Sequence, residues 1–402
     1  MSRGRAGDRS APPAGALPLI HSLIHGECGG NAERERTSFR VSSALSNESG
    51  SAFADSVVPE GFPIHRRTES RVRLLPAGSR DGEQVSAGAK ASNSQALRAQ
   101  TREAVPRSSA MARGFLGWLV VGCGLGLAIG IPRGIARHLT LADGVVVALQ
   151  ALIMAGFVLT AIVLLRRRVD RRSLTDLGWS CRAGRALLIG VVVAVVTGLV
   201  TWVPAALAGW IEIESIDVGA FLLFLLANTV VIVAYEALPE EFALRGYAWT
   251  NLRDGWGLAV ATTVTTALFP FTAIVASSVA WLATSALGGV GEAPQLVPQG
   301  NDPLIYIVQL VAFGLVLVAA RRIPVRGALL VAVAFHAAHL TVNRLLLGGS
   351  GWLDSGWSVT FVEEDAIGLV LMNLALAGAV FIGIRRRRLS QIESGTERAD
   401  SQ

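Results

Sequence analysis

The amino-acid sequence predicts an all-α protein, a polytopic integral membrane bundle of about eight transmembrane helices. Of its 402 residues, 51% are hydrophobic and only 16% are charged, and the mean hydropathy is +0.49. This composition is too apolar for an ordinary water-soluble domain. The 43 glycines and the low aromatic content of 6% favour closely packed helices over a β-barrel with aromatic girdles.

From residue 114 onward, short polar loops separate apolar runs that are long enough to cross about 30 Å of hydrocarbon as helices. The first run is rich in glycine, which favours helix packing over a nucleotide-binding loop because no strand precedes it and no lysine follows it. The fifth run is overlong and holds Pro270 near its middle, so we expect a kink or a break there. The expected spans are residues 114–131, 144–165, 186–207, 219–244, 257–284, 304–320, 327–347 and 367–384.

Residues 1–110 differ from the rest of the chain, because they are polar and contain no long apolar run. Such a segment cannot bury enough surface to offset its chain entropy, so we expect it to be disordered. A second interpretation is that translation starts at Met111 and that residues 1–110 are not made. The remaining regions are N-terminal transmembrane helices at 111–215, a core at 219–347, and a last helix with a basic tail at 348–402.

The arginines predict the orientation of the spans. Seven lie between residues 166 and 185, three between 321 and 326, and four at 385–388, always in alternate loops. Because positively charged loops stay in the cytoplasm, we expect both termini to be cytoplasmic. Arg133 and Arg137, between the first two spans, are an exception. The run at 166–172 also suits contact with anionic lipids.

The charge and the cysteines narrow the expected partners. The net charge of +6 rests on arginine, since Lys90 is the only lysine, a bias typical of high-GC bacterial genomes. We therefore expect the bacterial plasma membrane as location and the lipid bilayer as partner, and nucleic-acid binding is not implied. Cys28, Cys123 and Cys181 lie far apart, so neither a disulfide framework nor a zinc finger is expected.

Charged side chains gather at the end of the fourth span. Such groups are costly inside a membrane, so they are candidates for function. Glu241 and Arg245 are four residues apart and can pair on a helix, whereas Glu240 is turned about 100° away and stays available. Glu236 lies four residues before Glu240, on the same face if the helix continues past Pro239, an arrangement suited to a general base. The structural alternative is an interfacial ion-pair cluster.

The seventh span carries a second polar set. His336, His339 and Asn343 lie at helical offsets that place them along one stripe. The other histidines fall in residues 1–110 or in a loop, so histidine chemistry inside the bilayer must use these two. The structural alternative is hydrogen bonding between helices that holds the bundle together.

These residues resemble the CPBP intramembrane proteases, a family that includes the type II CAAX prenyl-protein endopeptidases and the bacterial Abi proteins. The motif Glu-Glu-x-x-x-Arg is present from Glu240 to Arg245, and His-x-x-x-Asn from His339 to Asn343. The resemblance covers residues 219–347. It implies that Glu240 activates a water, that Glu241 and Arg245 form a supporting ion pair, and that His339 and Asn343 donate to the oxyanion.

One family motif is incomplete. Phe-x-x-x-His usually lies between the other two motifs, but here Phe269 is followed by Ala273 where histidine is expected. His336, one helical turn from His339, is placed to fill this gap. Two function classes stay open: an endopeptidase that cuts a peptide or protein tail, and a catalytically impaired member that acts as a membrane scaffold or immunity protein.

The metal requirement is also open. Glu240, His336 and His339 are able to hold Zn²⁺ with a water in the fourth position. A water activated by glutamate without a metal is equally compatible with the residues.

Overall fold

The structure is a computed structural model that describes residues 106–298, 301–346, 353–362 and 368–400. The disorder expected for residues 1–110 falls almost wholly outside this range. The expectation of disorder is wrong for residues 107–110, because the first helix already begins at Arg107. The indole nitrogen of Trp256 donates to the Arg107 carbonyl at 2.9 Å, and Ala110 is fully buried, so tertiary contacts order this start.

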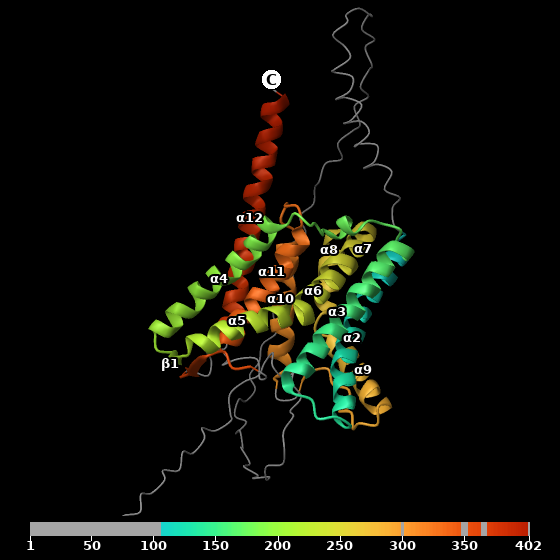
Figure 1. Ribbon diagram of the computed structural model, residues 1–402. Coiled ribbons are helices and arrows are strands. Elements are labelled where there is room, and N and C mark those ends of the chain that lie inside the picture. The colour runs from blue at the N-terminus through green and yellow to red at the C-terminus, as the bar shows by residue number, and fades with distance from the viewer. Residues whose placement is uncertain (1–105, 299–300, 347–352, 363–367, 401–402) are drawn as a thin grey trace, which may run out of the picture. The chain divides into compact units, whose positions relative to one another are not determined.

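Helices dominate the described residues (Figure 1), and η marks short π- or 3-10 turns. In chain order the elements are α2 (Arg107–Ala136), α3 (Asp143–Leu164), η2 (Leu165–Val169), η3 (Leu174–Leu177), α4 (Gly184–Leu207), β1 (Ile211–Ile216), α5 (Val218–Ile232), η4 (Val233–Ala237), α6 (Leu238–Glu241), η5 (Phe242–Ala248), α7 (Trp249–Trp256), α8 (Leu258–Leu268), α9 (Thr272–Ala286), α10 (Pro303–Arg321), α11 (Ala328–Leu346), β2 (Trp357–Phe361) and α12 (Leu369–Asp400).

The chain is a polytopic all-α bundle, as the sequence predicts. Within the described residues, seven helices are long and apolar enough to cross a membrane, and an eighth span is formed if the bent pair α8 and α9 is counted as one. Each matches an expected apolar run. The pair bends by 45° at Pro270, which has no amide hydrogen to donate and whose ring clashes with the preceding turn.

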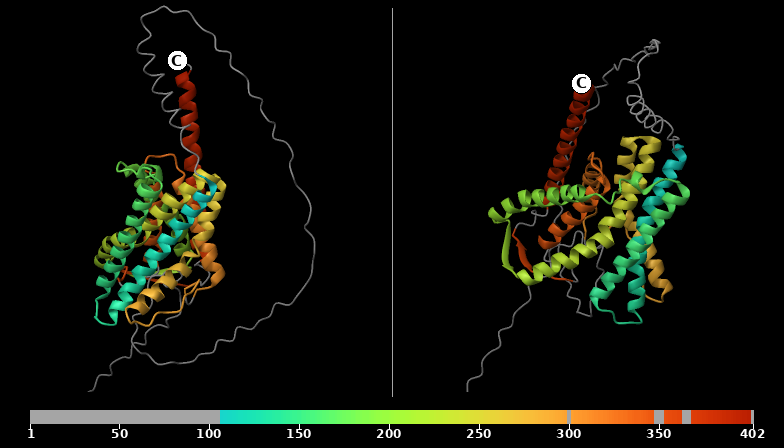
Figure 2. Two further views of the ribbon diagram at one scale, coloured as in Figure 1. Left: turned by 90° about the vertical axis from the view of Figure 1, so that its right-hand side faces the viewer. Right: turned by 45° about the horizontal axis from the view of Figure 1, so that its top comes forward.

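Glycines let α2 approach its neighbours closely, and Figures 1 and 2 show it beside α3 and α9. A Cβ atom built on Gly126 would lie 2.5 Å from the carbonyl oxygen of Ala276, and one on Gly130 would lie 2.6 Å from that of Ala280. No side chain fits at such distances, so these glycines are packing positions. The interpretation of the first run as a packing surface is confirmed.

A small sheet joins the loops at one end of the bundle. β1, which joins α4 to α5, pairs antiparallel with β2, which precedes α12. The carboxylate of Glu214 accepts hydrogen bonds from Ser358 at 3.1 Å and Thr360 at 2.7 Å. These hydroxyls hold the pKa of Glu214 below its usual value. The expected all-α bundle lacked this sheet, although residues 211–214 alternate apolar and polar side chains.

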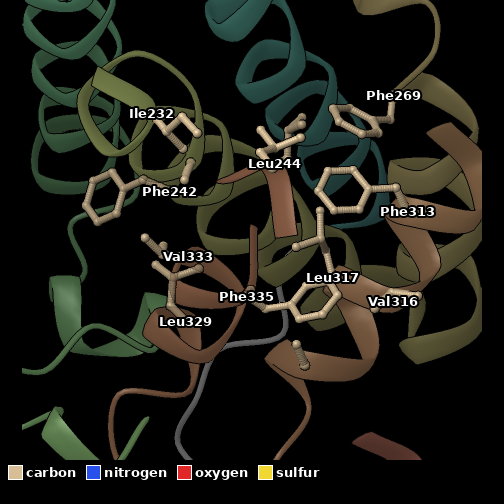
Figure 3. Packing of buried hydrophobic residues seen from close by; sticks show 14 of the residues in the cluster. Ile232, Phe242, Leu244, Phe269, Phe313, Val316, Leu317, Leu329, Val333 and Phe335 are labelled. Carbon is tan, nitrogen blue, oxygen red and sulfur yellow. The ribbon is translucent and has the colours of Figure 1, made fainter. Parts of the chain in front are cut away.

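The hydrophobic core reaches the polar side chains of the fourth and seventh spans. Phe269 directly follows α8, Phe313 lies on α10, and Phe335 lies on α11 (Figure 3). The ring centroid of Phe313 lies 6.3 Å from that of Phe269 and 6.5 Å from that of Phe335. This aromatic cluster walls the candidate site on the side of α10.

Candidate active site

The fourth span does not run as a regular α-helix past its polar residues. It passes through the π-turn η4, the short α6 and the longer π-turn η5 before it resumes as α7. Pro239 lies in the first turn of α6, where it cannot donate a backbone hydrogen bond. Wider π-turns change the direction of the following side chains and are frequent at functional sites.

Glu241 is the centre of a buried trio. Its Oε1 atom accepts a hydrogen bond from Nη1 of Arg245 at 3.0 Å and lies 3.2 Å from Nδ1 of His336 on α11. The ion pair expected between Glu241 and Arg245 is therefore present, and His336 joins it. The Arg245 guanidinium also lies 4.6 Å from the ring centre of Phe269, a cation–π distance.

His339 and Asn343 form the second polar pair, one turn apart on α11. Nε2 of His339 lies 3.2 Å from Nδ2 of Asn343. The amide donates in this arrangement, which leaves the imidazole proton on Nδ1. The ring packs against both Phe313 and Phe335, at centroid distances of 5.3 and 5.5 Å with small interplanar angles. These two aromatic contacts restrict the orientation of the imidazole.

Glu240 keeps a free carboxylate. It is half-buried, and it makes no hydrogen bond or ion pair with any residue that the structure describes. Its charge interacts with those of His336, Glu236, Glu241 and Arg245. The sequence predicts this contrast between a paired Glu241 and an available Glu240, and the geometry agrees with it.

Glu236 is engaged by a residue that the sequence reasoning missed. Nη2 of Arg344 donates to Oε1 of Glu236, and Nη1 donates to the amide oxygen of Asn228 at 3.0 Å. The amide nitrogen of Asn228 in turn donates to the Thr341 hydroxyl at 3.3 Å. Glu236 therefore has a charge partner of its own. The sequence does indicate Arg344 as a candidate, because this charged residue follows Asn343 directly and lies inside an expected span.

The zinc site considered from the sequence is not assembled. Among the residues that the structure describes, no three His, Cys, Asp or Glu side chains are placed to hold a metal ion. Nδ1 of His336 faces Glu241 rather than Glu240, and Nε2 of His339 faces Asn343. The three side chains as placed therefore do not fit a metal ion.

Ala273 makes none of the hydrogen bonds of this polar set. It is buried in the first turn of α9, after the bend, where the neighbouring Thr272 hydroxyl accepts a hydrogen bond from the Trp118 indole at 3.0 Å. Phe269, the first residue of the incomplete motif, does contact Arg245. The aromatic part of the motif is therefore at the site.

Several buried polar atoms at the site have no partner among the described residues. They are Oε2 of Glu241, Nε and Nη2 of Arg245, Nδ1 of His339, Oδ1 of Asn343 and the hydroxyl of Tyr235. Buried polar groups are normally hydrogen-bonded, and internal water supplies the missing partners where protein does not. A group of such atoms beside a free carboxylate is suited to hold water and a polar substrate group.

These features define a polytopic helical membrane protein with a buried carboxylate, imidazole and guanidinium cluster between its fourth and seventh spans. No protein-family model, curated protein or solved structure matches the chain.

Proposed function

We propose that the chain is an intramembrane endopeptidase of the CPBP type that hydrolyses a peptide or protein tail with a glutamate-activated water. One observation carries the proposal: Glu240 is free, while the adjacent Glu241 is held by Arg245 and His336. A carboxylate without a partner inside a membrane span is costly and is a candidate for function. We further propose that the protein lies in the bacterial plasma membrane with both termini in the cytoplasm.

The proposed reaction uses the two polar sets together. Glu240 takes a proton from a water molecule, and the resulting hydroxide attacks the scissile carbonyl carbon. Nδ1–H of His339 and the Asn343 amide donate hydrogen bonds to the carbonyl oxygen as it becomes negatively charged. Glu240 then returns the proton to the leaving amine. Arg245 and His336 fix Glu241 and so position the backbone that carries Glu240.

A substitution that removes the base tests the proposal. In purified protein, Glu240→Gln should lower the rate of cleavage of a peptide library by about 10²- to 10⁴-fold, with and without a chelator. Glu212→Gln is the matched control, because Glu212 is an exposed glutamate on β1 and should leave the rate unchanged. Cleavage by Glu240→Gln at the wild-type rate would refute the assignment.

A second candidate function, a catalytically impaired scaffold or immunity protein, is favoured by one observation. Ala273 stands where the family carries a histidine. If the wild-type protein cleaves no peptide and Ala273→His creates cleavage that requires Glu240, the scaffold function is the correct one. If the wild-type protein cleaves and Ala273→His adds nothing, the endopeptidase is supported and His336 is sufficient.

A further inference from the structure

The arginine-rich end of the bundle contains two groups of arginines that differ in their partners. In the first group every guanidinium meets an aspartate. Arg166 lies 2.9 Å and Arg113 lies 3.3 Å from Asp170, and Arg172 lies 2.7 Å from Asp254. Arg166 is fully buried, so this residue of the run at 166–172 does not contact lipid as expected. The positive charges of this first group are therefore offset by aspartates of the same chain.

The second group, here called the arginine cluster, consists of Arg185, Arg322, Arg385 and Arg388. None of the four forms an ion pair with a carboxylate among the residues that the structure describes. Their positive charges act on one another in two pairs. Arg322 interacts with Arg385, and Arg388 interacts with Arg185. The cluster is thus a concentration of positive charge without an internal counterion.

The backbone brings three elements together at the cluster. The connection from α10 to α11 packs on the segment before α4, where a Cβ on Gly327 would lie 2.8 Å from Cβ of Ala183. The Leu329 amide donates to the Gly178 carbonyl at 3.2 Å and strengthens this contact. α12 joins through Nη1 of Arg388, which lies 3.5 Å from the Pro324 carbonyl. The juxtaposition of the arginines is therefore built into the fold.

Holding these charges together costs free energy. Partial burial and the positive charge of Arg385 lower the pKa of the Arg322 guanidinium from its usual value. The start of α4 adds to the positive potential, because its N-cap residue makes no side-chain hydrogen bond and its first turn holds no acidic residue. Free backbone N–H groups at a helix start attract anions. The unpaired arginines and the open start of α4 therefore favour an external anion.

We propose that the arginine cluster binds the phosphate headgroup of an anionic phospholipid. Guanidinium groups form paired hydrogen bonds with phosphate oxygens, and basic pockets between membrane helices are suited to lipid headgroups. A lipid is favoured over soluble phosphate because the cluster borders lipid-facing side chains. Leu187 and Leu188 on α4 are 42% and 63% exposed, close to Arg185, and are placed to contact an acyl chain.

The test compares lipid-dependent stability in two charge-matched variants of the full chain. Arg322→Gln combined with Arg385→Gln removes two members of the cluster. Arg386→Gln combined with Arg387→Gln removes the same charge from exposed neighbours on α12. Each protein is placed in nanodiscs of phosphatidylcholine with and without phosphatidylglycerol, and its thermal unfolding midpoint is measured. Binding of phosphatidylglycerol to the protein in detergent is titrated in parallel.

Phosphatidylglycerol should raise the midpoint of the wild-type protein and of the Arg386 and Arg387 variant. The cluster variant should lose this rise and bind phosphatidylglycerol about 30-fold more weakly. In phosphatidylcholine it should be at least as stable as wild type, because repulsion is relieved. Equal loss in both variants, or no preference for phosphatidylglycerol, would overturn the proposal. An equal effect of inorganic phosphate would identify a soluble anion instead. None of these readouts depends on peptide cleavage.

Discussion

Adjacent glutamates at the end of the fourth span have different surroundings. Glu241 is fully buried and shares its oxygen between Arg245 and His336, whereas Glu240 is half-buried and has no partner among the described residues. Glu236, one turn earlier, is bound by Arg344. Two of the three carboxylates are thus held in place by cations. The third is left for chemistry, and this contrast underlies the proposed mechanism.

The pair formed by Glu236 and Arg344 should be coupled in stability. Both side chains are less than a tenth exposed, so Arg344→Met leaves a buried carboxylate without a countercharge and should lower the free energy of unfolding by about 3–5 kcal/mol. Adding Glu236→Gln removes that charge and should restore most of the loss. Unfolding of the wild type, both single variants and the double variant in detergent measures the coupling. Additive effects of the two changes would show that the pair is not formed.

The sequence predicts the ion pair and the free glutamate, because spacing on a helix decides which side chains share a face. It does not predict that His336 binds Glu241 or that Arg344 binds Glu236. Those contacts join the fourth and seventh spans, which are far apart in the chain, and the π-turns around Pro239 rotate the side chains away from regular helical positions.

Glycine spacing decides how the first helix packs. Gly122, Gly126 and Gly130 recur every four residues on α2 and face α9, where built Cβ atoms would meet Val275, Ala276 and Ala280. The apolar runs of the sequence predict the positions of these helices, and Pro270 predicts the break in the fifth. The partner of α2 was not readable from the sequence, because small residues allow close approach without identifying the helix that approaches.

An alanine at Gly126 should separate α2 from α9. The added methyl group overlaps the Ala276 carbonyl, so Gly126→Ala should lower the free energy of unfolding by about 1–3 kcal/mol. Gly156→Ala is the control, since Gly156 on α3 has nothing within 4 Å of its built Cβ. The control should unfold at the same temperature or higher. Equal destabilisation by both changes would contradict the packing assigned to Gly126.

The pairing of β1 with β2 should depend on pH through Glu214. Its pKa is lowered in the folded protein, so its contribution to stability is present above the usual glutamate pKa and is lost as the pH falls through the lowered value. The protection factors of the strand amides, which are corrected for the intrinsic slowing of exchange in acid, should therefore fall as the pH drops below about 4.3 in the wild type. Glu214→Gln should lack this change, and Glu212→Gln on the same strand should keep it. A pH response that survives in Glu214→Gln would contradict the assignment.

The described residues form one bundle whose polar groups are sorted between its interior and its ends. Composition and run length alone predict the all-α membrane architecture, because every backbone group inside lipid must be satisfied within a helix. Arginine placement predicts which ends face the cytoplasm. Arg133, the exception between the first two spans, lies 3.4 Å from Glu292. That pairing offsets its positive charge.

Reporter fusions test the proposed orientation. Residue 215, on β1 between α4 and α5, should face the outside and residue 395 the cytoplasm, because the arginine-rich ends carry the retained positive charge. An alkaline phosphatase fusion at residue 215 and a fluorescent protein fusion at residue 395 should both be active. The same sidedness at the two positions would contradict the five spans expected between them.

The proposed division of labour between the adjacent glutamates is tested by measuring cleavage rate and unfolding midpoint together in Glu240→Gln and Glu241→Gln. Glu240→Gln should lower the cleavage rate by about 10²- to 10⁴-fold and keep the midpoint, because the side chain has no partner to lose. Glu241→Gln should lower the midpoint, because it leaves Arg245 buried without its countercharge. The opposite pattern, with cleavage retained in Glu240→Gln and its midpoint lowered, would contradict the role of Glu240 as the catalytic base.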